Sequence, residues 1–125
     1  MNDAFDPAST LMVLTGNQDV RAFDPPPDFW SRPGEFVGDG RLMLATRRTG
    51  DDAHWEMHPN GEEVVMLFSG AVDLIVEEDG GERVVKLRGR SAFVVPRGVW
   101  HRAVCVQAGE MLYITAGEGT QHRAV

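Results

Sequence analysis

Turns that contain glycine divide the chain, from residue 41 onward, into segments of about four to eight residues. The clearest turn is Asp79-Gly80-Gly81, which follows an alternating apolar segment and is typical of a tight hairpin. Short segments between regularly spaced turns favour β-strands, and no stretch predicts a helix longer than one or two turns. The sequence therefore predicts an all-β fold, either a small antiparallel β-barrel or a sandwich of two sheets.

The 125 residues are enough for one domain with a modest core. We expect the barrel to span residues 41–116 and a C-terminal tail to follow over residues 117–125. Residues 1–40 are expected to supply a strand, at residues 11–14, and a proline-rich loop. The loop, residues 23–30, holds three prolines, which exclude a regular helix or a central strand. We expect this N-terminal segment to pack on the barrel or on a dimer partner, where the loop would cover a core edge or act as a lid or contact arm.

The composition is that of a soluble globular protein, with 42% apolar and 25% charged residues. The net charge is −7 and the basic residues are scattered, which argues against nucleic-acid binding. We expect arginines on strands, such as Arg48, to lie on solvated faces rather than to bind a substrate. No apolar run predicts a membrane span, and the acidic N-terminus lacks the pattern of a signal peptide. The single cysteine, Cys105, cannot form an internal disulfide, so we expect a cytoplasmic protein.

Residues 54–63 bring two histidines and three glutamates close together in the sequence. The pair Asn60-Gly61 within this segment is a strong signal for a two-residue hairpin turn, because both residue types adopt positive φ angles. Such a hairpin would place His58 directly across from Glu63, with Cβ atoms about 5 Å apart. An imidazole and a carboxylate at that separation can bind the same cation.

Strand alternation adds a further candidate ligand. His54, Glu56 and His58 are expected to point to one face of their strand. Residues two apart lie about 7 Å apart along a strand and can share an ion, whereas residues four apart lie about 13 Å apart. The predicted metal ligands are therefore Glu56, His58 and Glu63. His54 is expected behind these ligands or at the mouth of the pocket.

A third histidine, His101, follows the turn Pro96-Arg97-Gly98 and is the predicted fourth ligand. On a regular strand His101 would share a face with Ala103 and Cys105. The small Ala103 side chain would leave room for a pocket beside the metal. We interpret Cys105 as a small buried residue near this pocket, with a reactive thiol as the alternative.

Two motifs resemble those of the cupin superfamily over residues 41–116. The matching residues of the first motif are Glu56, His58, Glu63 and Gly70, and those of the second are Pro96, Gly98 and His101. The resemblance implies a small single-domain cupin, a jelly roll that is typically a homodimer, and we expect residues 11–14 to be the interface strand. The chain departs from the cupin pattern where Glu56 replaces the first histidine and Cys105 replaces the closing asparagine.

The resemblance also implies a function. Two histidines and two carboxylates form a hard, negative ligand set that favours Fe²⁺, Mn²⁺ or Zn²⁺ over copper. Such a cupin would be a divalent-metal-dependent enzyme acting on a small organic molecule, most often a dioxygenase and less often an isomerase or decarboxylase. His58, Glu63 and His101 would hold the metal, and Glu56 would be a fourth ligand or a catalytic base. The alternatives are a non-catalytic ligand-binding or sensor domain, and a degenerate site whose metal was lost with the change to Glu56.

Overall fold

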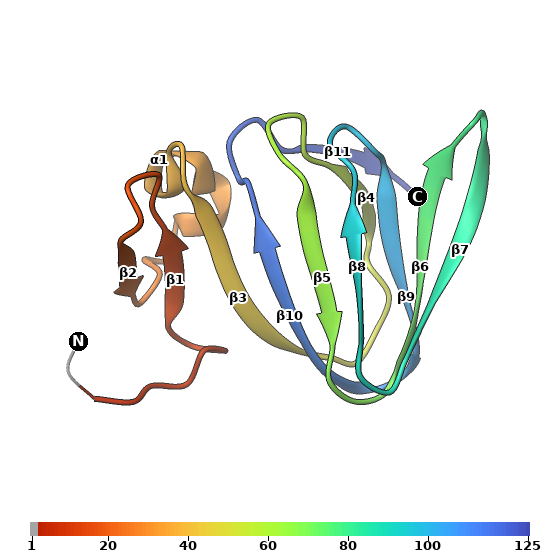
Figure 1. Ribbon diagram of the computed structural model, residues 1–125, viewed down its shortest axis with the longest axis horizontal. Helices are drawn as coiled ribbons and strands as arrows, with labels where there is room; N and C mark the ends of the chain where they lie inside the picture. The colour runs from red at the N-terminus through yellow and green to blue at the C-terminus, as the bar shows by residue number, and fades with distance from the viewer. Residues whose placement is uncertain (1–2) are drawn as a thin grey trace.

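The computed structural model describes residues 3–125, which form two antiparallel sheets packed face to face (Figure 1). The first sheet contains, in spatial order, β2 (Val20–Phe23), β1 (Leu11–Leu14), β3 (Arg41–Arg48), β10 (Gly109–Thr115), β5 (Glu63–Leu67) and β8 (Ser91–Val95). The second sheet contains β11 (Gln121–Ala124), β4 (His54–Met57), β9 (His101–Gln107), β6 (Ala71–Glu78) and β7 (Gly81–Arg88). The prediction of an all-β jelly roll is confirmed, although the two sheets do not close into a barrel.

The hairpin between β6 and β7 forms at the turn that the sequence predicts. Asp79 and Gly80 have φ angles of 52° and 75°, and Glu78 pairs with Gly81. Two consecutive positive φ angles are the requirement of the two-residue turn that matches the twist of paired strands. A glycine at the second position adopts this conformation without steric cost.

The main hydrophobic core lies between the two sheets. It is built from alternating inward side chains: Val65, Leu67, Val72, Leu74, Val76, Leu87, Val95, Ala103 and Met111. A smaller cluster lies under the N-terminal segment and contains Leu11, Val13, Phe29, Val37 and Leu42. The alternation of buried and partly exposed residues along β5 shows why these strands form, because one face is removed from water and the other is not.

The predicted hairpin between His58 and Glu63 is wrong. Strands β4 and β5 belong to different sheets, and the loop between them crosses from one sheet to the other. Asn60 and Gly61 do not have the positive φ angles of a two-residue hairpin turn. Instead, Asn60 Nδ2 donates a hydrogen bond to the Glu118 carbonyl at 2.8 Å. A Cβ atom on Gly61 would lie only 2.8 Å from the Ala116 Cβ, so glycine is required here for close approach.

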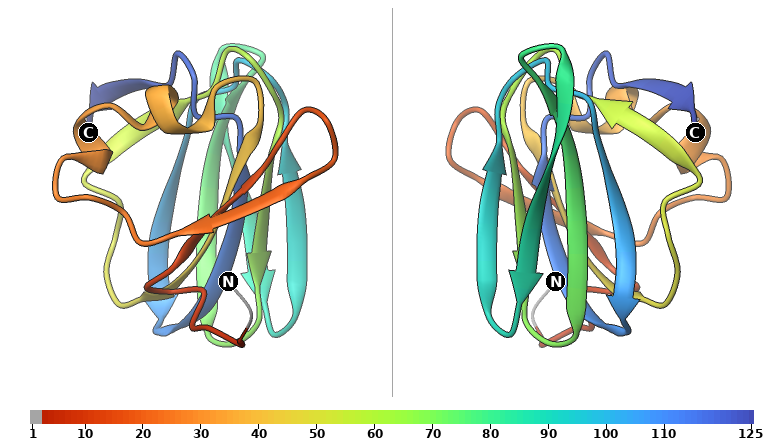
Figure 2. Two further views of the ribbon diagram at one scale, coloured as in Figure 1. Left: turned by 90° about the vertical axis from the view of Figure 1, so that its left-hand side faces the viewer. Right: turned by 90° about the vertical axis from the view of Figure 1, so that its right-hand side faces the viewer.

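The helical connection between β2 and β3 lies beside the C-terminal segment at one end of the sandwich, where Gly34 approaches Glu118 (Figure 2). A 3₁₀ helix, η1 (Phe29–Ser31), and a short helix, α1 (Pro33–Val37), connect β2 to β3. Phe29 is fully buried, whereas the neighbouring Trp30 is 61% exposed. The predicted tail, residues 117–125, contains β11, which pairs with β4 along its length. The predicted boundaries at residues 40 and 116 stay a prediction, and residues 1 and 2 lie outside the described residues.

The two helices are short elements within the described part of the chain. Among residues 3–125, neither of them has the length and apolar character needed to cross a membrane.

Candidate metal centre

Three predicted ligands converge between the sheets. Glu63 begins β5 in the first sheet, whereas His101 begins β9 and His58 follows β4 in the second. Glu63 Oε1 lies 2.9 Å from His101 Nε2, and Glu63 Oε2 lies 3.3 Å from His58 Nε2. The candidate ligand atoms of all three residues lie within 4.8 Å of one another. Ligand atoms that each lie about 2.1 Å from one cation are about 3 to 4 Å apart. The two Glu63 contacts have separations of this size, so the group fits a divalent metal ion.

Hydrogen bonds fix the tautomers of both histidines. His101 Nδ1 donates to the Val99 carbonyl at 3.0 Å, which leaves Nε2 facing the site. The Thr120 hydroxyl donates to the Gly117 carbonyl at 3.0 Å, so its oxygen accepts from His58 Nδ1, which lies 2.9 Å away. When the imidazoles are neutral, each keeps its proton on Nδ1, and its Nε2 atom presents a lone pair to the site. Metal-binding histidines in proteins are commonly oriented by such a bond from the other ring nitrogen.

The buried carboxylate and imidazoles stabilise one another's charged forms. Burial raises the pKa of Glu63, but hydrogen bonds with His101 and His58 outweigh burial and lower it to about 2. Burial lowers the pKa of His58, but hydrogen bonds with Glu56 and Glu63 outweigh burial and raise it to about 9. The pKa of His101 is raised too, because its hydrogen bond with Glu63 outweighs burial. A metal ion at this site would have to displace protons from the imidazoles.

Glu56 lies at the border of this group. Its Oε1 atom is 3.1 Å from His58 Nε2. In the antiparallel pairing of β4 with β9, Glu56 lies directly across from His101. Its other oxygen lies 3.9 Å from His122 Nε2, and the side chain is 38% exposed. This position is compatible with both predicted roles of Glu56, a fourth ligand or a base that exchanges protons with solvent.

The two remaining candidates lie away from the three-residue group. His54 is exposed, and its ring centroid lies 6.3 Å from that of His122 on β11. Cys105 is partly buried, with its thiol 3.9 Å from the Arg48 carbonyl. It lies four residues beyond His101, about 13 Å along a regular strand.

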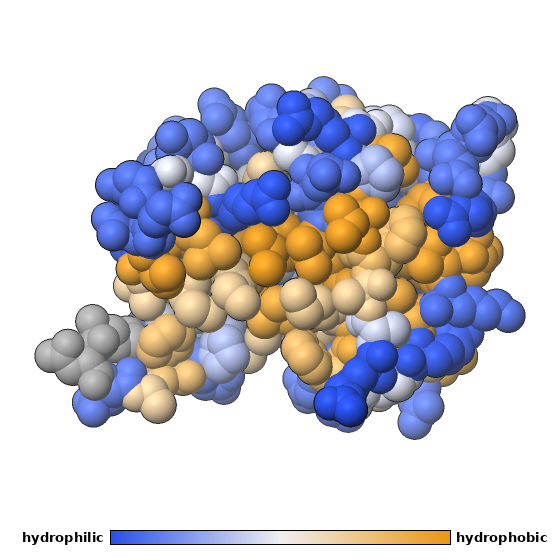
Figure 3. All heavy atoms as spheres, viewed as in Figure 1, coloured by the Kyte–Doolittle hydropathy of each residue, from blue (hydrophilic) through white to orange (hydrophobic). Residues whose placement is uncertain are grey.

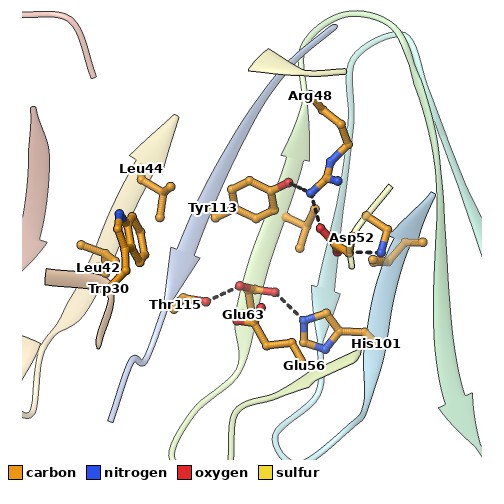
Figure 4. Close-up of a pocket in the computed structure, with 13 residues that line it drawn as sticks. Trp30, Leu42, Leu44, Arg48, Asp52, Glu56, Glu63, His101, Tyr113 and Thr115 are labelled. Atoms are coloured by element: carbon orange, nitrogen blue, oxygen red, sulfur yellow. Dashed lines mark hydrogen bonds and ion pairs between the residues drawn. The ribbon is translucent and has the colours of Figure 1, made fainter. Parts of the chain in front are cut away.

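A cavity of about 220 Å³ adjoins the group (Figure 4). Glu56, Glu63, His101 and Thr115 line one end of it. The apolar side chains that line it are Trp30, Leu42, Leu44, Val65, Leu74 and Ala103. Ala103 lines the cavity, as expected from its small side chain on the face of His101. The other polar lining residues are Arg48, Asp52 and Tyr113.

Sequence reasoning missed two threonines. The Thr115 hydroxyl donates to Glu63 Oε2, and Thr120 orients His58. Thr115 had a usable signal, because it follows Met111 and Tyr113 at alternate positions of a strand and polar side chains at inward positions need partners. Thr120 lies in a turn before β11 and carries no such pattern.

Solved structures show which fold this is. A cupin-2 domain protein from Shewanella frigidimarina is 18% identical and has a TM-score of 0.51, over 59% of this chain and 68% of that chain. Oxalate decarboxylase from Bacillus subtilis, solved as an R92A mutant, is 18% identical with a TM-score of 0.53, over 69% of this chain and 23% of that chain. Hydroquinone 1,2-dioxygenase PnpCD, in complex with Cd²⁺ and 4-hydroxybenzonitrile, is 16% identical with a TM-score of 0.50, over 60% of this chain and 56% of that chain.

These likenesses establish that the chain has the cupin fold. No family model matches the sequence, and no curated protein matches it. The three structures described above are each less than 25% identical to this chain, so the likeness establishes the fold alone.

Proposed function

We propose that this protein is a metal-binding cupin that acts on a small organic molecule as an enzyme of the dioxygenase type. The observation that supports this proposal is the convergence of His58, Glu63 and His101 on one point at the end of a cavity. Two imidazole nitrogens with one or two carboxylates suit Fe²⁺, Mn²⁺ or Zn²⁺. Among the proteins of similar fold, one is a dioxygenase solved with Cd²⁺ and another is a decarboxylase with Mn(II) centres.

The residues of the site have separate roles in this proposal. A bound divalent metal would activate O₂ or polarise a substrate oxygen. Val99 and Thr120 hold the two imidazoles in the orientation that binding requires. Glu56 reaches both the group and the cavity, so its carboxylate can accept a proton from the substrate and release it to solvent through its exposed side.

A non-catalytic ligand-binding or sensor domain is the second candidate. The ion pairs of Glu63 with His58 and His101 favour it, because they satisfy the buried group without a metal. In this case the cavity would bind a small molecule, and any signal would pass through another protein.

Metal content separates the two candidates. We expect elemental analysis of the purified protein to find one equivalent of iron or manganese, lost in His58→Ala and His101→Ala. The matched control is His122→Ala, because His122 is 60% exposed in its side chain and lies outside the group. An O₂-uptake screen on the loaded protein then tests catalysis. Absence of bound metal, together with no thermal shift on adding Fe²⁺, Mn²⁺ or Zn²⁺, would rule out a metal-dependent enzyme.

We further propose that the protein is a homodimer that pairs through the outer face of the first sheet. Two cross-strand rows of outward side chains on this face are apolar: Met12, Met43, Ile114, Val64 and Val94 in one, and Ala45, Leu112, Met66 and Ala92 in the other. Figure 3 shows this apolar surface as a band across the face. The outward face of a solvated sheet is normally polar, and these rows carry no charge that would repel a second copy. The expected interface strand, β1, supplies Met12 at the edge of this face.

A further inference from the structure

Arg48, Asp52 and Tyr113 form a second polar group that lines the same cavity (Figure 4). Arg48 Nη2 donates to Asp52 Oδ1 at 2.8 Å and to the Tyr113 hydroxyl oxygen at 2.9 Å. The Arg48 side chain is only 13% exposed, so the expectation that it lies on a solvated face is wrong. Its strand position, two residues beyond Thr46 on the inward side of β3, directs it between the sheets.

The backbone of β9 holds this group in place. Asp52 Oδ2 accepts from the Ala103 amide at 2.9 Å, and the Asp52 amide donates to the Ala103 carbonyl at 2.9 Å. Arg48 Nη1 also donates to the Gly50 carbonyl at 2.9 Å. Arg48 Nε is nevertheless buried without a hydrogen-bond partner among the described residues. A buried donor without a partner costs stability, so stability alone does not explain an arginine at this position.

The Tyr113 hydroxyl is a second donor of this group that is poorly satisfied, because it has only a weak acceptor. Its oxygen accepts from Arg48, while its own proton is directed to Met111 Sδ at 3.3 Å. A thioether sulfur is a weak acceptor. Burial raises the pKa of Tyr113 and outweighs the lowering by Arg48, so the phenol stays protonated. A ligand oxygen that enters the cavity would be a better acceptor than the sulfur.

The cavity has room for about one ring between its two polar groups. An apolar cavity of about 150 Å³ holds benzene, and this cavity measures about 220 Å³. Tyr113 and Thr115 are two positions apart on β10, which separates them by about 7 Å along the strand. Thr115 touches Glu63, so the metal group and the tyrosine lie toward opposite ends of a ring-sized space walled by Leu44, Val65 and Leu74.

We propose that the cavity binds a one-ring molecule with an oxygen substituent at each end. One oxygen faces His58, Glu63 and His101, and the other accepts the hydrogen bond of Tyr113. Arg48 is a positioning residue that orients the phenol. The proposal rests on the proposed function for the first end only, because the second end requires no metal.

Isothermal titration of the Zn²⁺-loaded protein with 4-hydroxybenzoate and with benzoate tests the second end. We expect the wild-type protein to bind 4-hydroxybenzoate about tenfold more tightly, the effect of one buried hydrogen bond. Tyr113→Phe should bring the ratio of the two Kd values to about one and leave the Kd for benzoate unchanged. Arg48→Met should reduce the ratio and Arg48→Lys should restore part of it. Arg47→Met is the matched control, because Arg47 is the preceding residue with a side chain that is 61% exposed.

Three results would overturn the proposal: equal affinities in the wild-type protein, no binding of either compound, or a preference that persists in Tyr113→Phe. Thermal melting of each variant checks that it folds, and Tyr113→Phe decides the matter even where the Arg48 variants do not fold. The same titrations without metal separate this proposal from the proposed function. A protein that binds no metal but still prefers 4-hydroxybenzoate through Tyr113 would contradict the metal centre and retain the tyrosine site.

Discussion

Glu63 Oε1 lies 2.9 Å from His101 Nε2, although the two residues begin strands in opposite sheets. The Glu63 side chain is 6% exposed and bonds with its other oxygen to Thr115 and His58. One carboxylate thus links both sheets and both histidines. Its removal would leave the buried His101 Nε2 atom without its carboxylate partner and His58 Nε2 with Glu56 alone.

We therefore expect Glu63→Gln to destabilise the metal-free protein by about 3 kcal/mol, because removing one member of a buried ion pair leaves the charge of the other member uncompensated. It should also abolish stoichiometric metal binding. Urea denaturation and elemental analysis measure the two effects. Glu62→Gln is the control, since Glu62 is exposed. Equal stability of the two variants would contradict the role of Glu63.

Thr120→Val should weaken metal binding by about 10- to 100-fold, the usual effect of removing the partner that orients a ligand histidine. The valine cannot accept the Nδ1 proton of His58, which then has no fixed tautomer. Thr120→Ser keeps the hydroxyl and should bind metal as the wild-type protein does. Competition with a chelator of known affinity gives the Kd values. Equal affinities of the valine and serine variants would show that this bond does not orient His58.

The free energy of unfolding of the metal-free protein should fall at both alkaline and acidic pH. The pKa of His58 rises from 6.5 to about 9 on folding, so its contribution is fully present below pH 6.5 and is lost as pH rises through 9. The pKa of Glu63 falls from 4.5 to about 2, so its contribution is present above pH 4.5 and is lost as pH falls toward 2. This pair therefore contributes most between pH 4.5 and 6.5.

Urea midpoints of the metal-free protein, measured from about pH 5.5 to about pH 9.5, test the alkaline side. His58→Gln should show a smaller loss over this range than the wild-type protein. His101, whose pKa is also raised, accounts for the part that remains. An identical loss in both proteins would assign the effect to other groups.

Ile114→Glu should convert the proposed dimer into a monomer, because it places a charge in the centre of the apolar face of the first sheet. Light scattering measures the mass. Val84→Glu is the control, since Val84 is 49% exposed on β7 of the second sheet and should leave the dimer intact. A monomeric mass for the wild-type protein would end the proposal.

Local patterns in the sequence were sufficient for the strands but not for their partners. The β6–β7 hairpin follows from Asp79-Gly80 because both residues of the turn and both strands are neighbours in the chain. His58 and Glu63 do come together, but through a loop that crosses between the sheets rather than through the predicted hairpin. Asn60 forms a hydrogen bond to Glu118 instead of a tight turn, and no local rule anticipates a partner that distant.

The same limit applies to the site. The candidate ligands could be named because their spacing resembles known motifs, and the structure brings three of the four together. Their role as metal ligands stays a prediction. The contacts of Thr120 with His58 and of Arg48 with Tyr113 could not be predicted from the sequence. Each joins segments that are far apart in the chain and that only the packing of the sheets brings together. Arg48 was misplaced because the alternation of β3 does not show which of its faces is inward.

Strand β11 has a consequence for how the chain can be divided. Arg123 on this strand stacks between Trp55 and Trp100, with its guanidinium carbon 5.2 Å and 4.6 Å from the two rings. The strand holds the turn that carries Thr120 against His58. A fragment cut after residue 116 would keep every candidate ligand and both cupin motifs, yet lose the group that orients one histidine. The stretch that resembles cupins is thus shorter than the stretch needed to build the centre.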